Sequence, residues 1–178
     1  MEEMFLSADR PFFQSSSMMT LSCIDKEKYL DFANNFFKGQ SRAMDEDTFE
    51  YIYDVSDKVT WYVQAILHGI YEHSKDVIDR QLVDDVVREI IESQSTAYQN
   101  YCAWLTENQQ RLLTAIARER LVASPLGQKF VRSYNLPAVS SVKAALKSLV
   151  DKQLISKTPQ GYYVSDRFFA KWLSGRVF

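Results

Sequence analysis

The chain has 178 residues, of which 46% are hydrophobic and 13% aromatic, a composition typical of a globular protein of one domain or two small ones. Its formal net charge is −2, and it has no apolar run long enough to cross a bilayer. The first four residues lack the positive start and apolar stretch of a signal peptide, so we expect a cytoplasmic protein. Its two cysteines, Cys23 and Cys102, are isolated, which argues against a disulfide scaffold or a zinc ribbon.

The near-neutral total charge conceals two oppositely charged halves. Residues 1–105 carry 9 Lys and Arg against 19 Asp and Glu, whereas residues 106–178 carry 12 against 4. The pattern of predicted elements also changes near Thr106. We therefore treat the acidic and basic halves as separate regions.

The acidic half predicts a short strand followed by a helical bundle. An apolar run bounded by serines and Asp25 indicates a strand that ends near residue 24. Apolar residues at spacings of three and four predict four helices: one from residue 25 that stops at Gly39, one over 45–55, one over about 59–71 and one that begins near 79. The acidic start at Asp45 suits a helix N-terminus. We expect the aromatic pairs Phe36-Phe37 and Trp61-Tyr62 to lie in the core.

The segment over residues 93–105 connects the halves, and its aromatic residues indicate packing rather than a loose linker. The residues concerned are Tyr98, Tyr101, Trp104 and Leu105. We therefore expect a rigid connection.

The basic half has the element order of a winged helix. Thr106 and Gln109 have the spacing of a capping box, and Ser124-Pro125 predicts the N-cap and first position of a second helix that runs to about Tyr134. After a turn at 135–137, a third helix is predicted over 140–152. Two short strands around the turn 158–161 then form the wing. The predicted fold class is mainly α, a lid-like helical bundle followed by a winged helix-turn-helix domain with a small β wing.

The third helix of this domain is the candidate recognition surface, because in helix-turn-helix proteins this helix enters the major groove. Its predicted exposed residues are Ser140, Ser141, Lys143, Lys147 and Ser148. Lys157 and Gln160 add polar groups from the wing, and the lysines suit contacts with phosphates. The same lysines could equally keep the helix soluble, and winged helices also bind proteins. The partner thus remains open between DNA and protein.

The sequence does not support a metal site or a hydrolase nucleophile. His68 and His73 lack a third patterned metal ligand, so we predict no metal site. Ser15-Ser16-Ser17 lacks the Gly-x-Ser-x-Gly setting of a hydrolase nucleophile. No catalytic residue is predicted.

Several segments, taken in order, resemble the C-terminal portion of archaeal and bacterial P-loop ATPases of the AAA+/STAND type. They are Arg10-Pro11-Phe12-Phe13-Gln14, the strand ending at Leu21, Val59-Thr60-Trp61-Tyr62-Val63-Gln64, Ser124-Pro125, Val139-Ser140-Ser141-Val142-Lys143-Ala144-Ala145-Leu146 and Gly161-Tyr162-Tyr163-Val164. The resemblance covers nearly the whole chain. It implies that residues 1–24 are a remnant of the nucleotide-binding core, 25–95 a helical lid, and 96–178 a winged-helix domain.

The chain departs from that family because it lacks the GxxxxGK[ST] loop that holds phosphates and magnesium. The resemblance therefore implies no ATP hydrolysis by this chain alone, with ATP and Mg²⁺ bound by an intact family member whose core domain is missing here. By the same resemblance Arg10 and Lys58 are candidate nucleotide-sensing residues. Arg10 could instead pair locally near Pro11, and Lys58 could simply be solvated.

Three hypotheses follow. The first is a non-catalytic lid and winged helix of an ATP-dependent switch, either a fragment or a truncated gene product, that couples nucleotide state to DNA or protein. The second is a DNA-binding transcriptional regulator whose acidic bundle serves dimerisation or effector response. The third is a protein-binding adaptor of the toxin, antitoxin or phage type.

Overall fold

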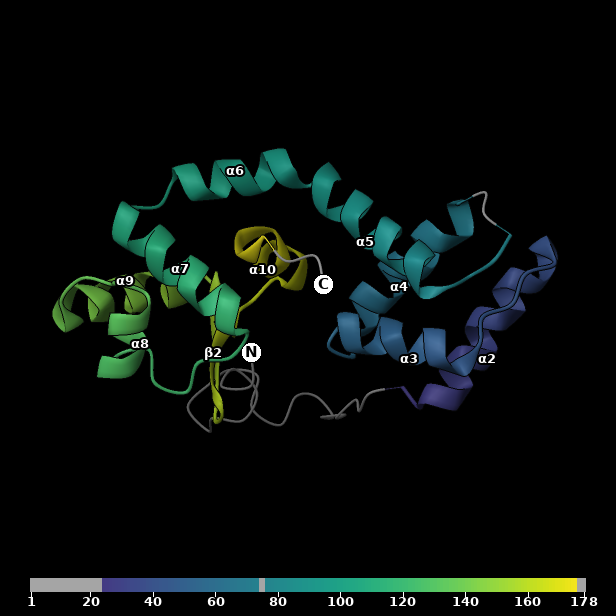
Figure 1. The fold of residues 1–178 in the computed structure, drawn as a ribbon, viewed down its shortest axis with the longest axis horizontal. Coiled ribbons are helices and arrows are strands. Elements are labelled where there is room, and N and C mark those ends of the chain that lie inside the picture. Colours follow the sequence, from purple (N-terminus) through teal and green to yellow (C-terminus); the bar gives the residue numbers. More distant parts are fainter. Residues whose placement is uncertain (1–23, 74–75, 176–178) are drawn as a thin grey trace, which may run out of the picture.

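The computed structural model describes residues 24–73 and 76–175, and the element labels follow Figure 1. Those residues form nine α-helices, a short 3₁₀ turn at Lys38–Gln40 and one two-stranded sheet. This confirms the predicted mainly α fold. The predicted strand before residue 24 and Arg10 lie outside the described residues. Among the helices described, none combines the length and apolar character needed to cross a membrane.

The four helices predicted in the acidic half are confirmed. They are α2 (Lys26–Phe37), α3 (Glu46–Val55), α4 (Thr60–Glu72) and α5 (Arg80–Ser93). Asp25, Asp45 and Asp79 cap α2, α3 and α5, because each side chain accepts a hydrogen bond from a backbone N–H in the first turn. At Asp45 this bond, donated by Thr48, is the main reason why the pKa of the carboxyl is lowered.

The core prediction for the aromatic pairs is half wrong. Phe37 and Tyr62 are buried, but Phe36 is 61% exposed and Trp61 63% exposed. On α2 the buried residues Tyr29, Ala33 and Phe37 are spaced by four, so they form a narrow stripe along one side of the helix. A residue next to this stripe, such as Phe36, points sideways, where its ring packs edge-on against Tyr71 with 5.7 Å between the ring centroids.

The connection between the halves is a helix, α6 (Ser95–Ala103), which follows α5 after a single residue. The expectation of packing holds for Tyr98 and Leu105, which are buried, and is wrong for Tyr101 and Trp104, which are exposed. Only one side of this short helix meets the rest of the fold.

The C-terminal half has the predicted order of a winged helix. Its helices are α7 (Glu107–Glu119), α8 (Gln128–Ser133) and α9 (Val139–Asp151), and its strands are β1 (Ile155–Thr158) and β2 (Gly161–Val164). The strands are antiparallel, with Ile155 opposite Val164 and Thr158 opposite Gly161. Val122 forms an additional bridge to Tyr162 on the outer side of β2.

The start of the second helix in this half was predicted wrongly. Residues 124–127 form a turn, closed by a 3.0 Å hydrogen bond from the Gly127 N–H to the Ser124 carbonyl. Helix α8 begins only after this turn, with Gly127 as its N-cap. The Ser-Pro signal therefore marks a turn rather than the first residues of a helix, since proline at the second position of a turn is as favourable as at the start of a helix.

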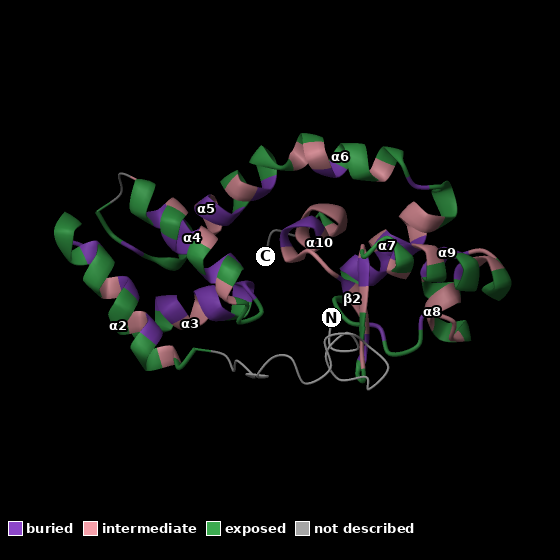
Figure 2. Ribbon diagram, turned by 180° about the vertical axis from the view of Figure 1, so that it is seen from behind, coloured by how far each residue is buried: buried purple, intermediate pink, exposed green. Residues whose placement is uncertain are grey.

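A final helix, α10 (Arg167–Ser174), was not predicted. It lies between α7 and the α5–α6 arm and contacts all three helices (Figure 1). Its buried residues Phe168 and Phe169 join a hydrophobic core that continues from the bundle into the winged helix. Figure 2 shows buried stretches on helices of both halves and on α10 between them. Helix α10 thus connects the two halves.

The capping box predicted at α7 is confirmed and gives a first test. The Thr106 hydroxyl accepts from the Gln109 N–H, and the Gln109 side chain accepts from the Thr106 N–H at 3.0 Å. Thr106→Ala should lower the free energy of unfolding by about 1 kcal/mol, because one helix-end donor loses its partner. Urea denaturation followed by circular dichroism measures the change. Thr106→Ser keeps the hydroxyl and should cost much less; equal losses in the two variants would contradict a capping role.

Candidate functional site

The junction between the bundle and the winged helix is built around the N-terminus of α10. The Asp166 carboxylate accepts from the backbone N–H groups of Phe168 and Phe169 at 2.8 and 3.0 Å. The hydroxyl of Tyr62, from α4, accepts from the Arg167 N–H at 2.9 Å and donates to Asp166 at 3.4 Å. Burial raises the pKa of Tyr62, so the hydroxyl stays protonated and able to donate to Asp166. A bundle side chain therefore completes the cap of α10.

Arg167 makes a second connection across the junction. Its side chain forms a 2.9 Å ion pair with Asp57, in the loop between α3 and α4. The same guanidinium lies 4.3 Å from the centre of the Tyr163 ring on β2, a cation–π contact. Arg167 thus contacts both the bundle loop and the wing.

Aromatic side chains fill the rest of the junction. Phe168 packs edge-on against Tyr62 with 4.8 Å between the ring centroids, and Phe169 stacks on Tyr98 at 4.9 Å. The Trp172 indole N–H donates to the Ser95 hydroxyl at 3.0 Å. These contacts combine apolar burial with directional bonds, so they specify one orientation of the winged helix on the bundle.

Lys58 lies beside this junction, in the same loop as Asp57. Both residues have left-handed backbone conformations, with φ of 61° and 51°. The Lys58 N–H donates to the Tyr53 carbonyl at 2.9 Å, which closes the end of α3, while its side chain is exposed. Arg10, the other predicted sensing residue, lies outside the described residues, so their pairing stays a prediction.

The predicted recognition face of α9 is largely accessible. Ser140, Lys143 and Lys147 are exposed, and Ser141 is half-buried. Ser148, expected to be exposed, is instead half-buried, because its hydroxyl accepts a 2.9 Å hydrogen bond from Gln109 on α7. That bond links α7 to α9, so Ser148 serves packing between helices.

The wing places Lys157 and Gln160 on a different element from α9. Both side chains are exposed, and the Lys157 ammonium lies 5.6 Å from the centre of the Tyr162 ring. Strand β1 contacts α9, so the wing and α9 are neighbouring elements of the winged helix. The exposed side chains of α9 and the wing remain the candidate partner surface.

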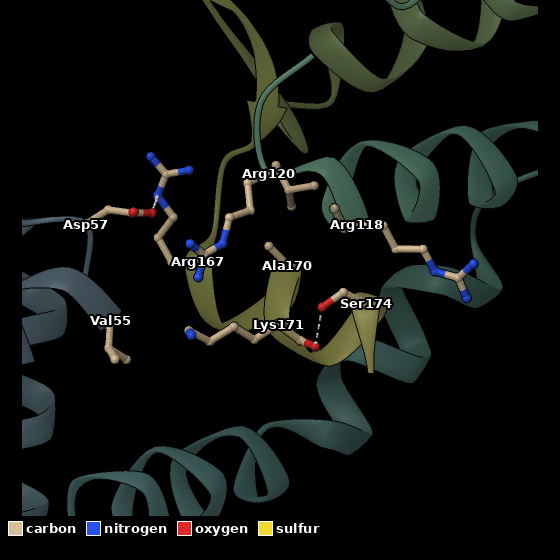
Figure 3. A pocket seen from close by; sticks show the side chains of 10 residues that line it. Val55, Asp57, Arg118, Arg120, Arg167, Ala170, Lys171 and Ser174 are labelled. Carbon is tan, nitrogen blue, oxygen red and sulfur yellow. Dashed lines mark hydrogen bonds and ion pairs between the residues drawn. The ribbon is translucent and has the colours of Figure 1, made fainter. Parts of the chain in front are cut away.

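A cleft with a volume of about 390 Å³ lies beside α10, where the sequence analysis predicted no site (Figure 3). Its charged lining residues are Asp57, Arg118, Arg120, Arg167 and Lys171. The sequence did contain a signal for the helix that carries two of them: an N-cap aspartate at 166, apolar residues at 168, 169 and 172, and a glycine at 175.

The search for a metal site concerns only the residues that the structure describes. Within residues 24–73 and 76–175, His, Cys, Asp and Glu side chains form no group of three or more that could hold a metal ion. His68 and His73 lie near single glutamates, with His73 Nε2 3.6 Å from Glu89.

Two comparisons with known proteins bear on this arrangement. Residues 96–175 match the family model of a probable winged helix domain, which confirms that part of the predicted fold. The structure is also similar to the Walker-type ATPase of Pyrococcus abyssi, with a TM-score of 0.62 and 13% sequence identity. The similarity covers 94% of this chain and 47% of that one, so the chain spans about half the length of that structure. No curated protein is significantly similar in sequence.

Proposed function

We propose that this chain is the lid and winged-helix region of an ATP-binding P-loop ATPase, in which it couples nucleotide state to a DNA or protein partner. The observation that carries the proposal is the structural similarity of 94% of the chain, which includes both the bundle and the winged helix, to a Walker-type ATPase. A winged helix alone is compatible with many functions. The shared placement of both parts favours an ATPase origin over an unrelated regulator.

In this proposal the P-loop core, ATP and Mg²⁺ are supplied by the part of the protein that carries the phosphate loop. The helical bundle then acts as a lid that moves with nucleotide state, with Arg10 and Lys58 as sensing residues. The junction supports this role, because Tyr62 and Asp57 of the bundle bind the two residues at the start of α10, Asp166 and Arg167. A displacement of the bundle loop would therefore act directly on the winged helix.

The genomic reading frame upstream of the codon for Met1 gives the direct test. A continuous frame that encodes a GxxxxGK[ST] segment is the expected result, and the longer protein should then hydrolyse ATP. In that protein, replacing the lysine of the loop should abolish hydrolysis. A stop codon immediately upstream, with no such loop encoded in the same frame, would contradict the proposal and favour a free-standing regulator or adaptor.

DNA is the partner that we propose to test first for the surface formed by α9 and the wing. Lys143, Lys147 and Lys157 are exposed there, and none of them forms an ion pair with another described residue. Exposed lysines on a recognition helix and its wing suit contacts with DNA phosphates. Such contacts release counterions from the DNA. A protein partner is the alternative outcome.

Reversing the charge of the two lysines on α9 should separate these partners. Lys143→Glu with Lys147→Glu should weaken binding to any duplex and make the plot of log affinity against log salt shallower by about 2, because each lost phosphate contact removes about one unit of slope. Fluorescence anisotropy across a salt series measures both quantities.

The matched control is Lys28→Glu with Lys38→Glu, which makes the same charge change at exposed positions on and next to α2. This control should retain most of the affinity and most of the salt slope. Equal weakening in both double variants would mean that net charge alone governs binding. Unchanged binding in the α9 variant would exclude this surface as the DNA site.

A further inference from the structure

One face of α9 is open to solvent, and in a helix-turn-helix protein this face would lie against the bases of DNA. Four exposed residues follow one another on it at spacings of three and four: Ser140, Lys143, Ala144 and Lys147. The buried residues of the helix lie on the opposite side. The exposed face therefore consists of lysines alternating with small side chains, and the carboxylate of Asp151 ends it.

The side chains near the start of α9 distinguish the base pairs only weakly, and this end of a recognition helix is the part that contacts base edges. The methyl group of Ala144 and the exposed side chain of Val139 suit contact with the methyl group of thymine. The Ser140 hydroxyl can bond to any base, and Lys143 is a flexible point charge that serves phosphates as well as guanine. A bidentate amide or guanidinium would instead discriminate by about tenfold to a hundredfold per base pair. The start of α9 thus favours thymine slightly.

The helix before α9 carries cations suited to the DNA backbone. In helix-turn-helix proteins the first helix of the motif crosses the backbone, and here that helix is α8. Its exposed Lys129 and Arg132 are three residues apart, so they lie on one side of the helix. Lys147 of α9 and Lys157 of the wing are exposed as well. Phosphate contacts from such residues supply affinity but no sequence information.

The tip of the wing adds one amide side chain, that of Gln160. This residue is exposed in the turn between β1 and β2. In the minor groove a glutamine separates A·T pairs from G·C pairs but cannot tell A·T from T·A. In the major groove its bidentate partner is adenine. In either groove, therefore, the wing favours A·T pairs, as the start of α9 does.

Building on the proposed function, in which DNA is the partner, we propose that this surface binds double-stranded DNA with little dependence on sequence and a modest preference for A·T pairs. Phosphate contacts from α8, α9 and the wing supply the affinity, and the small side chains of α9 let the helix approach the bases without fixing their identity. Sequence-specific proteins prefer their sites by about 10³- to 10⁷-fold, whereas we expect a spread of about tenfold here. Such a protein acts along DNA in general rather than at one operator.

The test incubates the whole chain with a pool of random duplexes about 20 base pairs long, two turns of the double helix, and sequences the bound DNA. The expected result is a raised A·T content without a fixed motif. Fluorescence anisotropy on single duplexes from the pool should give dissociation constants within about tenfold of one another. Replacing thymine by uracil, which lacks the methyl group, should weaken binding by about twofold to fourfold.

The possible failures are distinguishable. If no duplex binds, the proposed DNA partner itself is wrong. If duplexes bind but share a fixed motif, or if their dissociation constants differ by much more than tenfold, DNA remains the partner and the sequence tolerance is refuted. Bound DNA without A·T enrichment would refute the preference for A·T pairs.

Two variants separate the backbone contacts from the base contacts. Lys129→Gln with Arg132→Gln should weaken binding to every duplex by the same factor and make the salt slope shallower by about 2, because each phosphate contact contributes about one unit. Gln160→Ala should keep the salt slope and reduce the preference for A·T pairs. Both variants change exposed side chains, so their melting temperatures should match that of the wild type. An unchanged slope in the first or an unchanged preference in the second would refute the contact concerned.

Discussion

Phe168→Ala is expected to lower the free energy of unfolding by about 3–5 kcal/mol, the usual cost of removing a fully buried phenyl ring from a packed core. Phe168 is 2% exposed, and its ring packs against Tyr62, with 4.8 Å between the centroids. The alanine variant leaves a cavity where the bundle meets the winged helix. Urea denaturation followed by circular dichroism measures the loss as a lower midpoint.

Trp61→Ala is the matched control for this substitution. Trp61 lies on the same face of the junction, with its ring centroid 6.2 Å from that of Phe168, but it is 63% exposed. Removing it should cost about 1 kcal/mol or less, because little buried area is lost. Equal destabilisation by the two variants would contradict the packing of α10 against α4.

Gly161→Ala is expected to lower the free energy of unfolding by about 3 kcal/mol, through backbone strain and steric overlap together. Gly161 has φ of +150°, and an added Cβ would lie 2.6 Å from the Val122 carbonyl oxygen and 2.8 Å from its carbonyl carbon. Both are backbone atoms of the segment that pairs with Tyr162, so relief requires this segment to separate from β2. Faster amide hydrogen exchange at Val122 and Tyr162 should accompany the loss.

Gly39→Ala provides the comparison within the same chain. Apart from its chain neighbours, no atom of a described residue lies within 4 Å of a Cβ added there, and the residue sits in a 3₁₀ turn. The substitution should be neutral or should stabilise the protein by about 0.5 kcal/mol, because alanine restricts the unfolded chain. A Gly161→Ala variant as stable as Gly39→Ala would show that Val122 does not pair with the wing in solution.

Local sequence signals predicted most of the elements well. The acidic start at Asp45 and the Thr106 capping box place two helix starts correctly, because these signals act within one turn of backbone. The Ser124-Pro125 signal failed because the same dipeptide serves a turn and a helix start equally well, and the hydrogen bond from Gly127 decides between them.

One candidate site could be predicted from local sequence pattern, and two could not. The exposed lysines of α9 were predictable, because helical periodicity separates them from the buried Val142, Leu146 and Leu149. The junction and the cleft were not, since Asp57 and Arg167 meet across more than a hundred residues of sequence. Periodicity also cannot reveal which side of a helix lacks a neighbour, so the exposure of Phe36 required the assembled fold.

Helix α10 has a mechanical consequence for the molecule. The chain enters the winged helix through the α5–α6 arm and returns through α10, which contacts α5 and α6 again. The winged helix is therefore attached to the bundle at two places, through the α5–α6 arm and through α10. Separating the winged helix from the bundle would therefore require both bending at α6 and breaking the contacts of Asp166 and Arg167 with Tyr62 and Asp57. Because these contacts act only over short distances, we expect any such separation to be cooperative rather than graded.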